Sequence, residues 1–245
     1  MAAASASKSV AGKPGAARKV GRPAGQTARR ADRREELLHV AAAVFAERGY
    51  HRASMREIGE RWNVRQAAIY YYFPSKAKIL QAICEYAISQ FLDRLAVIEA
   101  SDLPAAQKVR LGVRAHIEPL IEQRFYVHAF LFQRRELPDE ARLPLDAKAR
   151  AYEALWDAIL SEGQKEGTIS SALDRRLAVL AILGMCNTVA RWSRTAAEFG
   201  LDQVAESFTQ LLSTGLFGAG VANAKHAKPA PVRSARSRKP AKAAR

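Results

Sequence analysis

The sequence predicts an all-α protein, and three observations lead to that prediction. Apolar residues from about residue 30 to residue 220 recur at helical spacing almost throughout, and no stretch shows the alternation typical of a strand. Caps and breakers such as Ser54, Pro138 and Asp174 stand at the ends of these periodic runs. The two ends of the chain lack large apolar side chains, so they cannot bury enough surface to fold. We therefore expect a disordered basic arm over 1–30, a small three-helix unit over 31–80, a larger helical domain over 81–220 and a disordered basic tail over 221–245.

The small unit begins with a predicted helix from about Arg30 to Arg48. Leu37, Ala41 and Val44 share one face of this helix at a spacing of 3.6 residues per turn. Gly49 follows directly, and a glycine just past the end of a helix is a common cap. The sequence therefore predicts that this helix ends at Arg48.

A second, short helix is predicted from Ser54, because Ser54 and Glu57 form an S-x-x-E capping box. Asn63 then stands where a tight turn needs a positive φ, which asparagine tolerates. Another short helix is predicted over Arg65 to Tyr72. Ser75 is placed to cap the long helix that follows, which carries an apolar stripe over five turns.

The larger domain contains five further predicted helical segments. The first starts at Pro104, the second covers residues 123–136, and the others run from Ala147 to Gly163, from Leu177 to Arg194 behind the capping residue Asp174, and from Leu201 to Leu216. The stretch from Leu177 to Met185 is apolar nearly all round, which is typical of a helix that is covered on two sides.

The net charge of +15 lies at the two ends of the chain. Residues 1–34 carry nine Lys and Arg residues against one acid, and residues 221–245 carry eight against none. The residues between them hold 22 bases and 23 acids, so the central part is close to neutral. A strong basic excess indicates nucleic acid or an anionic membrane surface as a partner.

Several classes of protein are excluded. The longest nearly apolar stretch, Leu177 to Ala190, is about 14 residues long, which is short of the roughly 18 that a membrane span needs. Cys84 and Cys186 form no metal or redox motif and are expected in the core. No nucleophile elbow, phosphate-binding loop, metal cluster or carboxylate pair is found, so we expect no catalysis, no metal and no cofactor. We expect a cytoplasmic protein associated with the nucleoid.

Two short helices joined by a tight turn and supported by a third form a helix-turn-helix unit. Because many helical proteins contain such turns, the residue pattern is needed to decide what this unit does. The block AAAVFAERGYHRASMREIGERWNVRQAAIYYYFPSKAKIL, Ala41 to Leu80, resembles the TetR family of bacterial transcriptional regulators. Two departures exist: Gly59 stands where the family usually has alanine, and Ala67-Ala68 replace the commoner Gly-Thr pair. We expect Gly59 to loosen its short helix by up to about 1 kcal/mol.

The resemblance implies a role in DNA binding for particular residues. Arg65 and Gln66 open the recognition helix, where arginine can read guanine and glutamine can read adenine. The alternatives are a solvated charge at Arg56 or Arg65, a neutral surface residue at Gln66, and core aromatics at Tyr71 and Tyr72. Phe73 is expected in the core. The expected DNA contacts in this unit are Ser54, Arg56, Arg65, Gln66, Ala68, Tyr71, Tyr72 and Lys76.

The resemblance also implies that the larger domain binds a small-molecule effector and forms a homodimer through its last two helices. The phrases from Phe132 to Pro138 and from Asn187 to Arg194 look like those of a subgroup that senses acyl-CoA thioesters. Arginines could hold phosphates and an indole could stack on adenine. The alternative is that Arg191 and Arg194 pair with acids such as Glu198 while Trp192 fills the core. The expected effector-binding residues are Phe130, Trp156, Met185, Arg191, Trp192 and Arg194.

Gly21-Arg22-Pro23 resembles the core of an AT-hook, in which arginine enters the narrow minor groove of A·T-rich DNA. The alternative is a solvated arm with loose phosphate contacts. Together these features predict a ligand-released, homodimeric repressor that binds double-stranded operator DNA. The competing hypothesis is an architectural protein that binds DNA without sequence specificity through its basic ends.

Overall fold

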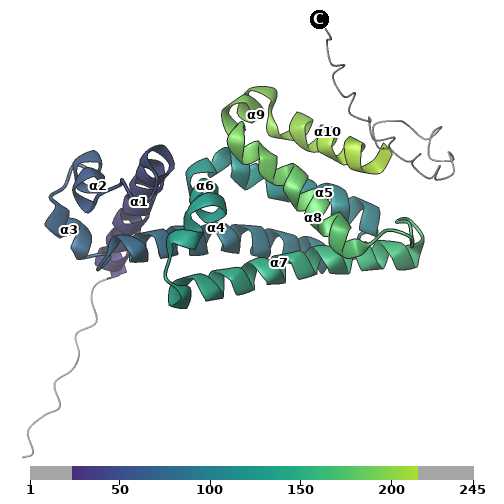
Figure 1. Ribbon diagram of the computed structural model, residues 1–245, viewed down its shortest axis with the longest axis horizontal. Coiled ribbons are helices and arrows are strands. Elements are labelled where there is room, and N and C mark those ends of the chain that lie inside the picture. Colours follow the sequence, from purple (N-terminus) through teal and green to yellow (C-terminus); the bar gives the residue numbers. More distant parts are fainter. Residues whose placement is uncertain (1–23, 215–245) are drawn as a thin grey trace, which may run out of the picture. The chain divides into compact units, whose positions relative to one another are not determined.

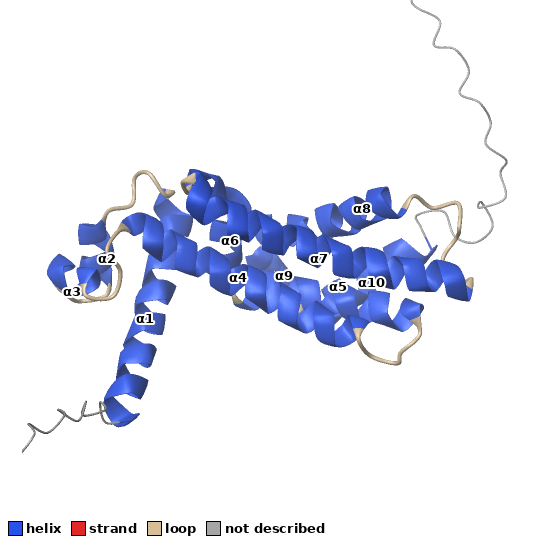
Figure 2. Cartoon of the chain, turned by 90° about the horizontal axis from the view of Figure 1, so that it is seen from below, coloured by secondary structure: helices blue, strands red, loops and turns tan. Residues whose placement is uncertain are grey.

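The structure, a computed structural model, describes residues 24–214 (Figure 1), and every element in this range is a helix (Figure 2). The all-α prediction is therefore confirmed. The elements are α1 (Ala24–Arg48), α2 (Met55–Arg61), α3 (Gln66–Tyr70), α4 (Lys76–Glu99), α5 (Ala105–Glu122), α6 (Arg124–Gln133), the 3₁₀ helix η1 (Arg134–Glu136), α7 (Asp139–Glu166), α8 (Arg175–Asn187), the 3₁₀ helix η2 (Thr188–Arg191), α9 (Ser193–Phe199) and α10 (Leu201–Thr214).

The helices belong to two compact units. The N-terminal unit consists of the described residues up to Ile88 together with Phe125–Asp146, and the C-terminal unit consists of Ser89–Arg124 together with the described residues from Ala147 on. The segment from α6 to the start of α7 therefore belongs to the N-terminal unit, whereas the sequence places a boundary near residue 80. Hydrogen bonds explain this: the Gln133 amide donates to the carbonyl of Phe45 at 2.7 Å, and His51 lies 2.5 Å from Glu136.

The core of the N-terminal unit is formed by the residues that share a face of α1. Leu37, Ala41, Val44 and Phe45 have no exposed surface. Gly49 caps α1 with a φ of 79°. The sequence prediction for this face and its cap is confirmed.

Helix α1 starts at Ala24, six residues before the expected Arg30. The expectation that the whole of 1–30 lacks structure is therefore wrong for 24–30. The physical reason is cooperativity: once the turns from Leu37 to Phe45 are packed, each further residue adds one hydrogen bond without a new nucleation cost. Alanine, glutamine and arginine are good helix formers, so the helix continues toward its N-terminus.

Two helices of the second half also differ from their predicted bounds. Helix α7 starts at Asp139 and not at Ala147, because two acids lie in its first turn, where the helix dipole favours them, and Arg142 forms ion pairs with Asp139 and Asp146. The predicted helix from Leu177 to Arg194 breaks after Asn187 into α8, η2 and α9. At the break the Thr188 hydroxyl donates to the carbonyl of Met185 at 2.7 Å, a bond that competes with the helix ladder.

The C-terminal unit packs around Trp156, which has no exposed surface. A Cβ added at Gly112 of α5 would lie 2.7 Å from the indole, so glycine is required where α5 meets this side chain. His116 is also buried; its imidazole lies 2.8 Å from the Tyr152 hydroxyl and 3.1 Å from the Asn187 amide oxygen. Burial lowers the pKa of His116 to about 4, so this histidine is a neutral core residue.

Candidate functional site

The turn between α2 and α3 is held by backbone and cap interactions. Ser54 accepts a hydrogen bond from the amide of Glu57 at 3.1 Å, and the Glu57 carboxylate accepts one from Arg48 at 3.1 Å. Asn63 has a φ of 55°, as predicted. The amide of Val64 then donates to the carbonyl of Gly59 at 2.8 Å. These bonds fix the direction in which α3 leaves the turn.

Gly59 has a role that the sequence did not reveal. A Cβ at this position would lie 2.9 Å from the carbonyl oxygen of Val64 and 3.4 Å from the amide nitrogen of Gln66. Because both atoms belong to the backbone, the turn would have to shift to accept any side chain. The expectation that Gly59 only loosens α2 is therefore incomplete: glycine lets α2 and α3 approach closely.

Helix α3 is anchored by one side chain and presents the others to solvent. Ile69 has no exposed surface, whereas Arg65 and Gln66 at the start of the helix are exposed and Ala68 is half-buried. The Gln66 amide donates to the Tyr70 hydroxyl at 3.3 Å, which orients it. Among the side chains of residues 29–213, none forms an ion pair with Arg65. A slim helix that presents an exposed guanidinium, an exposed amide and a methyl group suits the major groove.

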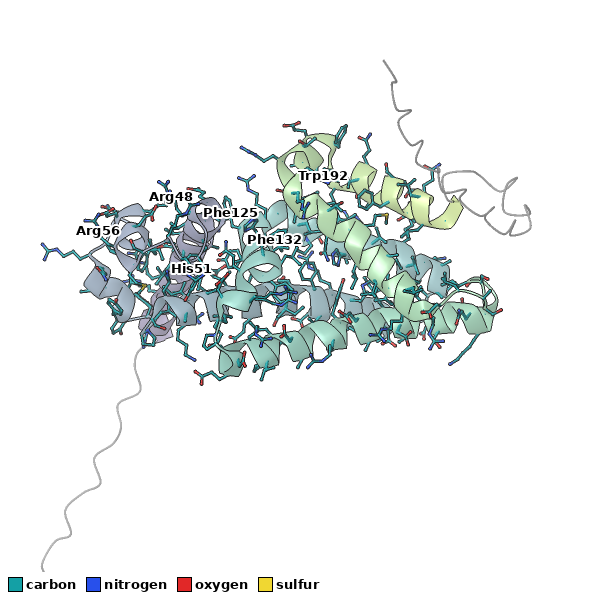
Figure 3. The ribbon with its side chains drawn as sticks, in the orientation of Figure 1. Arg48, His51, Arg56, Phe125, Phe132 and Trp192 are labelled. Atoms are coloured by element: carbon teal, nitrogen blue, oxygen red, sulfur yellow. The ribbon has the colours of Figure 1, made fainter. Side chains whose placement is uncertain are left out.

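Arg56 on α2 extends away from the ribbon (Figure 3), and its side chain is 79% exposed. Its guanidinium lies 3.5 Å from Glu60 one turn later, a surface pair that stabilises the protein little. The arginine is therefore available to a partner.

The three tyrosines after Ile69 differ in exposure. Tyr71 is 59% exposed and Tyr70 is 48% exposed, while Tyr72 is half-buried, with its ring centroid 5.7 Å from that of Trp62. Phe73 is buried, as expected. The alternative that Tyr71 is a core aromatic is therefore excluded, and its hydroxyl is available for hydrogen bonds at the surface.

Lys76 uses its ammonium group within the protein. Its Nζ donates to the carbonyls of Tyr50, His51 and Ala53 at 2.7, 3.3 and 2.8 Å. Burial lowers the pKa of Lys76. Since an ammonium has three N–H donors, this arrangement occupies all of them and ties the start of α4 to the segment after α1. Arg22, the other predicted basic contact outside α2 and α3, lies outside the described residues.

Three further arginines lie beside this surface that the sequence interpretation missed. Arg30, Arg33 and Arg34 of α1 are placed over the rings of Tyr71, Trp62 and Phe73, with guanidinium carbons 4.8, 4.6 and 4.8 Å from the ring centroids. The sequence contains a pattern that could have indicated this group: Arg30, Arg33 and Arg34 stand at positions i, i+3 and i+4, which share one face of a helix.

The predicted effector residues fall in different surroundings. Trp156 has no exposed surface, Met185 is half-buried, and Phe130 is buried in the N-terminal unit. Arg191 ends η2 and Arg194 lies in the first turn of α9. Both are exposed, and neither forms an ion pair with Glu198 or with another side chain of residues 29–213.

Trp192, between these two arginines, is half-buried, and its ring centroid lies 6.2 Å from that of Phe208 (Figure 3 labels Trp192). The junction of η2 and α9 therefore brings two free cations and an indole together. The alternative in which these arginines pair with Glu198 is not observed.

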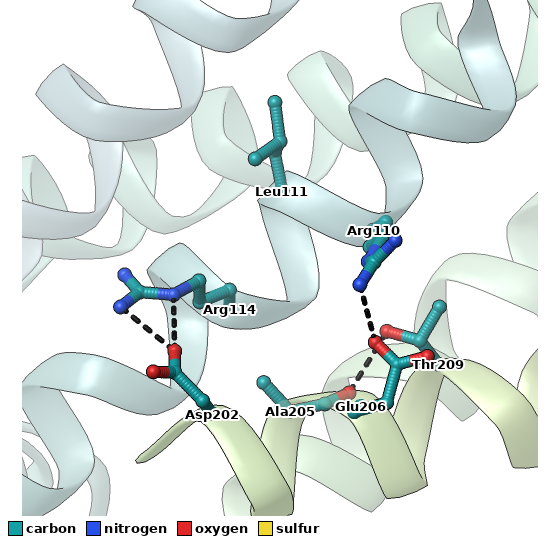
Figure 4. Close-up of a pocket in the computed structure, with 7 residues that line it drawn as sticks. All are labelled: Arg110, Leu111, Arg114, Asp202, Ala205, Glu206 and Thr209. Atoms are coloured by element: carbon teal, nitrogen blue, oxygen red, sulfur yellow. Dashed lines mark hydrogen bonds and ion pairs between the residues drawn. The ribbon is translucent and has the colours of Figure 1, made fainter.

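Two of the cavities in the C-terminal unit differ in character. One, of about 480 Å³, lies between α5 and α10 (Figure 4), where Arg110 pairs with Glu206 at 2.7 Å and Arg114 pairs with Asp202 at 2.9 Å. The other, of about 590 Å³, has no charged side chain in its lining. Its walls come from α5, the end of α7 with the loop after it, α8 and α10, and include Val109, Leu160, Ile169, Leu173, Ile182 and Leu212.

Comparison with known proteins agrees with this geometry. Residues 37–83 match the family model for bacterial regulatory proteins of the tetR family, and residues 102–216 match a model for the C-terminal domain of tetracyclin repressor-like proteins. The chain belongs to the TetR family. TetR-family members are transcriptional regulators that bind DNA through the helix-turn-helix, which here is α2, the turn and α3. The sequence-based resemblance is thereby confirmed.

Three relatives illustrate the similarity. The chain is 28% identical over 182 residues to the fatty acid metabolism regulator protein of Bacillus subtilis, covering 74% of this chain and 94% of the relative. It is 26% identical over 195 residues to the transcriptional repressor KstR2 of Rhodococcus jostii, covering 79% and 96%. A crystal structure of FadR from Bacillus subtilis in complex with stearoyl-CoA superimposes with a TM-score of 0.61 at 27% identity, covering 74% of this chain and 98% of that chain.

In the part of the chain that the structure describes, no group of three His, Cys, Asp or Glu side chains could hold a metal ion. Within the same range, no helix is both long enough and apolar enough to cross a membrane. Cys84 and Cys186 are buried, and burial raises the pKa of each thiol to about 12, which makes them unreactive.

Proposed function

We propose that this TetR-family regulator is a homodimeric repressor that reads its operator through α3 and leaves it when an effector binds. The observation that carries this proposal is the exposed start of α3, where Arg65 and Gln66 present their polar groups to solvent while Ile69 is buried. Arg56, Ala68, Tyr71 and the Tyr72 hydroxyl complete the DNA-facing set. We propose Ser54 as the cap that positions α2 and also as a phosphate contact.

We propose a different role for Lys76 from the DNA contact that the resemblance implies. Its three donors are taken by the carbonyls of Tyr50, His51 and Ala53, so it supports the helix-turn-helix from within. An ammonium in this position would have to give up a carbonyl to reach DNA. We place the protein in the cytoplasm with the chromosomal DNA and propose no catalytic step and no cofactor.

Exposed apolar side chains on α8 and α10 support the homodimer. Leu177 and Leu180 are 64% and 52% exposed, and Ala181 and Gly184 continue the same stripe at helical spacing. On α10, Leu211 and Leu212 are 43% and 36% exposed. An exposed apolar face of this kind is typical of a protein–protein interface. We propose that a second copy covers it.

We propose an acyl-CoA thioester as the effector. The relative whose crystal structure contains stearoyl-CoA supports this class of ligand. In this chain the free guanidinium groups of Arg191 and Arg194 would bind phosphates of the CoA, and Trp192 would stack on its adenine. Trp156 and Met185 of the C-terminal unit are proposed to contact the acyl chain, for which the buried Trp156 must first move. Binding of effector and of DNA would then be reciprocally coupled.

The effector proposal predicts a thermal shift. A long-chain acyl-CoA at about 100 times its Kd should add about 2.7 kcal/mol to the stability. For a chain of this size that raises the Tm by roughly 5–10 °C. Differential scanning fluorimetry with free CoA and free fatty acid as controls measures the effect, and the R191Q/R194Q variant should reduce it while R150Q leaves it unchanged. If no CoA ester raises the Tm or releases DNA, the thioester proposal is wrong.

Removal of the basic ends distinguishes the proposed repressor from the architectural alternative. Residues 1–23 carry five bases and residues 221–245 carry eight, and removing both leaves α1 intact. We expect log K to fall less steeply with log salt, by about 0.9 for each lost phosphate contact. The preference for operator over random competitor DNA should persist in a gel-shift titration. Loss of that preference together with the ends would favour the architectural hypothesis.

A further inference from the structure

Helix α1 changes character along one face. Toward its C-terminal end this face carries Leu37 and Leu38, which are buried in the core. One and two turns earlier, at positions that continue the same stripe, it carries Arg30, Arg33 and Arg34. These three side chains are on exposed residues, so α1 projects beyond the core with a basic face.

Each of the three arginines lies over an aromatic ring of the helix-turn-helix. Arg30 lies over Tyr71, Arg33 over Trp62 and Arg34 over Phe73. Trp62 directly follows α2, and Tyr71 and Phe73 come just after α3. The stacked guanidinium uses its flat face for the ring and keeps its N–H groups at the edge for other partners.

The three arginines differ in whether an acidic side chain pairs with them. Arg33 pairs with Glu36 at 2.7 Å, and the same carboxylate accepts a hydrogen bond from the indole of Trp62 at 3.3 Å. Among the described side chains, no acid pairs with Arg30 or Arg34. The face therefore has one neutralised arginine between two uncompensated ones.

We infer that Arg30 and Arg34 bind backbone phosphates of the DNA next to the site that α3 reads. This inference rests on the proposed function, because the ligand is the same DNA. Tyr71 links the two surfaces: it directly follows α3, is 59% exposed and carries Arg30 on its ring. Arginine binds phosphate oxygens through its N–H edge, and a guanidinium already held against a ring loses less freedom on binding. Arg33, with Glu36, holds α1 against the end of α2.

The experiment compares the unmodified full chain with five variants by fluorescence anisotropy over a salt series, on a selected operator and on random DNA. R30Q and R34Q each should lower the slope of log K against log salt by about 0.9, and the double variant by twice that. Each should also weaken binding by about tenfold at a fixed moderate salt concentration, equally on both DNAs. R33Q/E36Q removes the neutral pair without changing net charge, and R150Q removes an exposed arginine of the C-terminal unit. Both should leave the slope unchanged.

An additional variant, R30K, keeps the charge and should retain the slope while losing part of the affinity. An unchanged slope in R30Q and R34Q, or an equal effect of R33Q/E36Q, would overturn the inference and make the arginines structural. If the variants lose affinity in proportion to a loss in Tm, the inference is also overturned, because the arginines then act on stability. If the unmodified chain fails to prefer its operator, the proposed function is wrong, while the slopes on random DNA still test the phosphate contacts.

Discussion

Replacing Trp156 with alanine is expected to lower the free energy of unfolding by about 3–5 kcal/mol. The side chain has no exposed surface and lies in the core of the C-terminal unit. Removing it leaves a cavity that the surrounding helices can fill only in part. Urea unfolding followed by circular dichroism measures the change.

Trp192 provides the matched control, because it is a half-buried tryptophan of the same unit. Trp192→Ala should cost about 1 kcal/mol, in the range usual for substitutions outside the core. A similar cost for the two substitutions would contradict the burial of Trp156.

The contact between Trp156 and Gly112 allows a second test of the same core. Gly112→Ala alone should destabilise by about 1–3 kcal/mol, since its Cβ would lie 2.7 Å from the indole. In the double variant the new methyl group enters the space that the indole leaves. The double variant should therefore lose less unfolding free energy than the sum of the two single variants. Strict additivity would show that the two sites do not touch.

Arg65→Ala and Gln66→Ala are each expected to relax operator specificity at one base pair by about 1–3 kcal/mol, which is roughly 5- to 150-fold in affinity. Both side chains open α3 and are exposed, and the Gln66 amide is oriented by the Tyr70 hydroxyl at 3.3 Å. A base contact discriminates among sequences, whereas a phosphate contact weakens binding to all of them alike.

The measurement is a competition series in which each base pair of the selected operator is changed in turn. Each alanine variant should become indifferent at one position and keep its preference at the others. R150Q serves as the control and should behave as the unmodified protein does. An equal loss on every sequence would count against base recognition by that residue.

Local sequence patterns were sufficient for the helix-turn-helix. Ser54, Asn63 and Gly49 each have a backbone requirement that involves only neighbouring residues, and each was found in the predicted conformation. The exposure of Arg65 and the burial of Phe73 also followed from helical spacing and family pattern. Such features are predictable because they depend on contacts within a few residues.

Features that involve distant residues were not predictable in this way. Gly59 is required by the backbone of Val64 and Gln66 across the turn, and Lys76 is occupied by carbonyls more than twenty residues earlier in the chain. The break after Asn187 coincides with a bond to His116, 71 residues away. None of these partners can be inferred from the residues that surround each position in the sequence.

The net charge of +15 and its concentration at the two ends are properties of composition, and they already pointed to nucleic acid. The helical class and the family followed from periodicity and motif, because apolar spacing and caps act locally. Packing alone decided which arginines remain available. It placed Arg30 and Arg34 over aromatic rings without an acid partner, since these contacts arise only when α1 folds against the ends of α2 and α3. The pair of Arg33 with Glu36, in contrast, lies within α1 at a spacing of three residues and depends on local helix geometry.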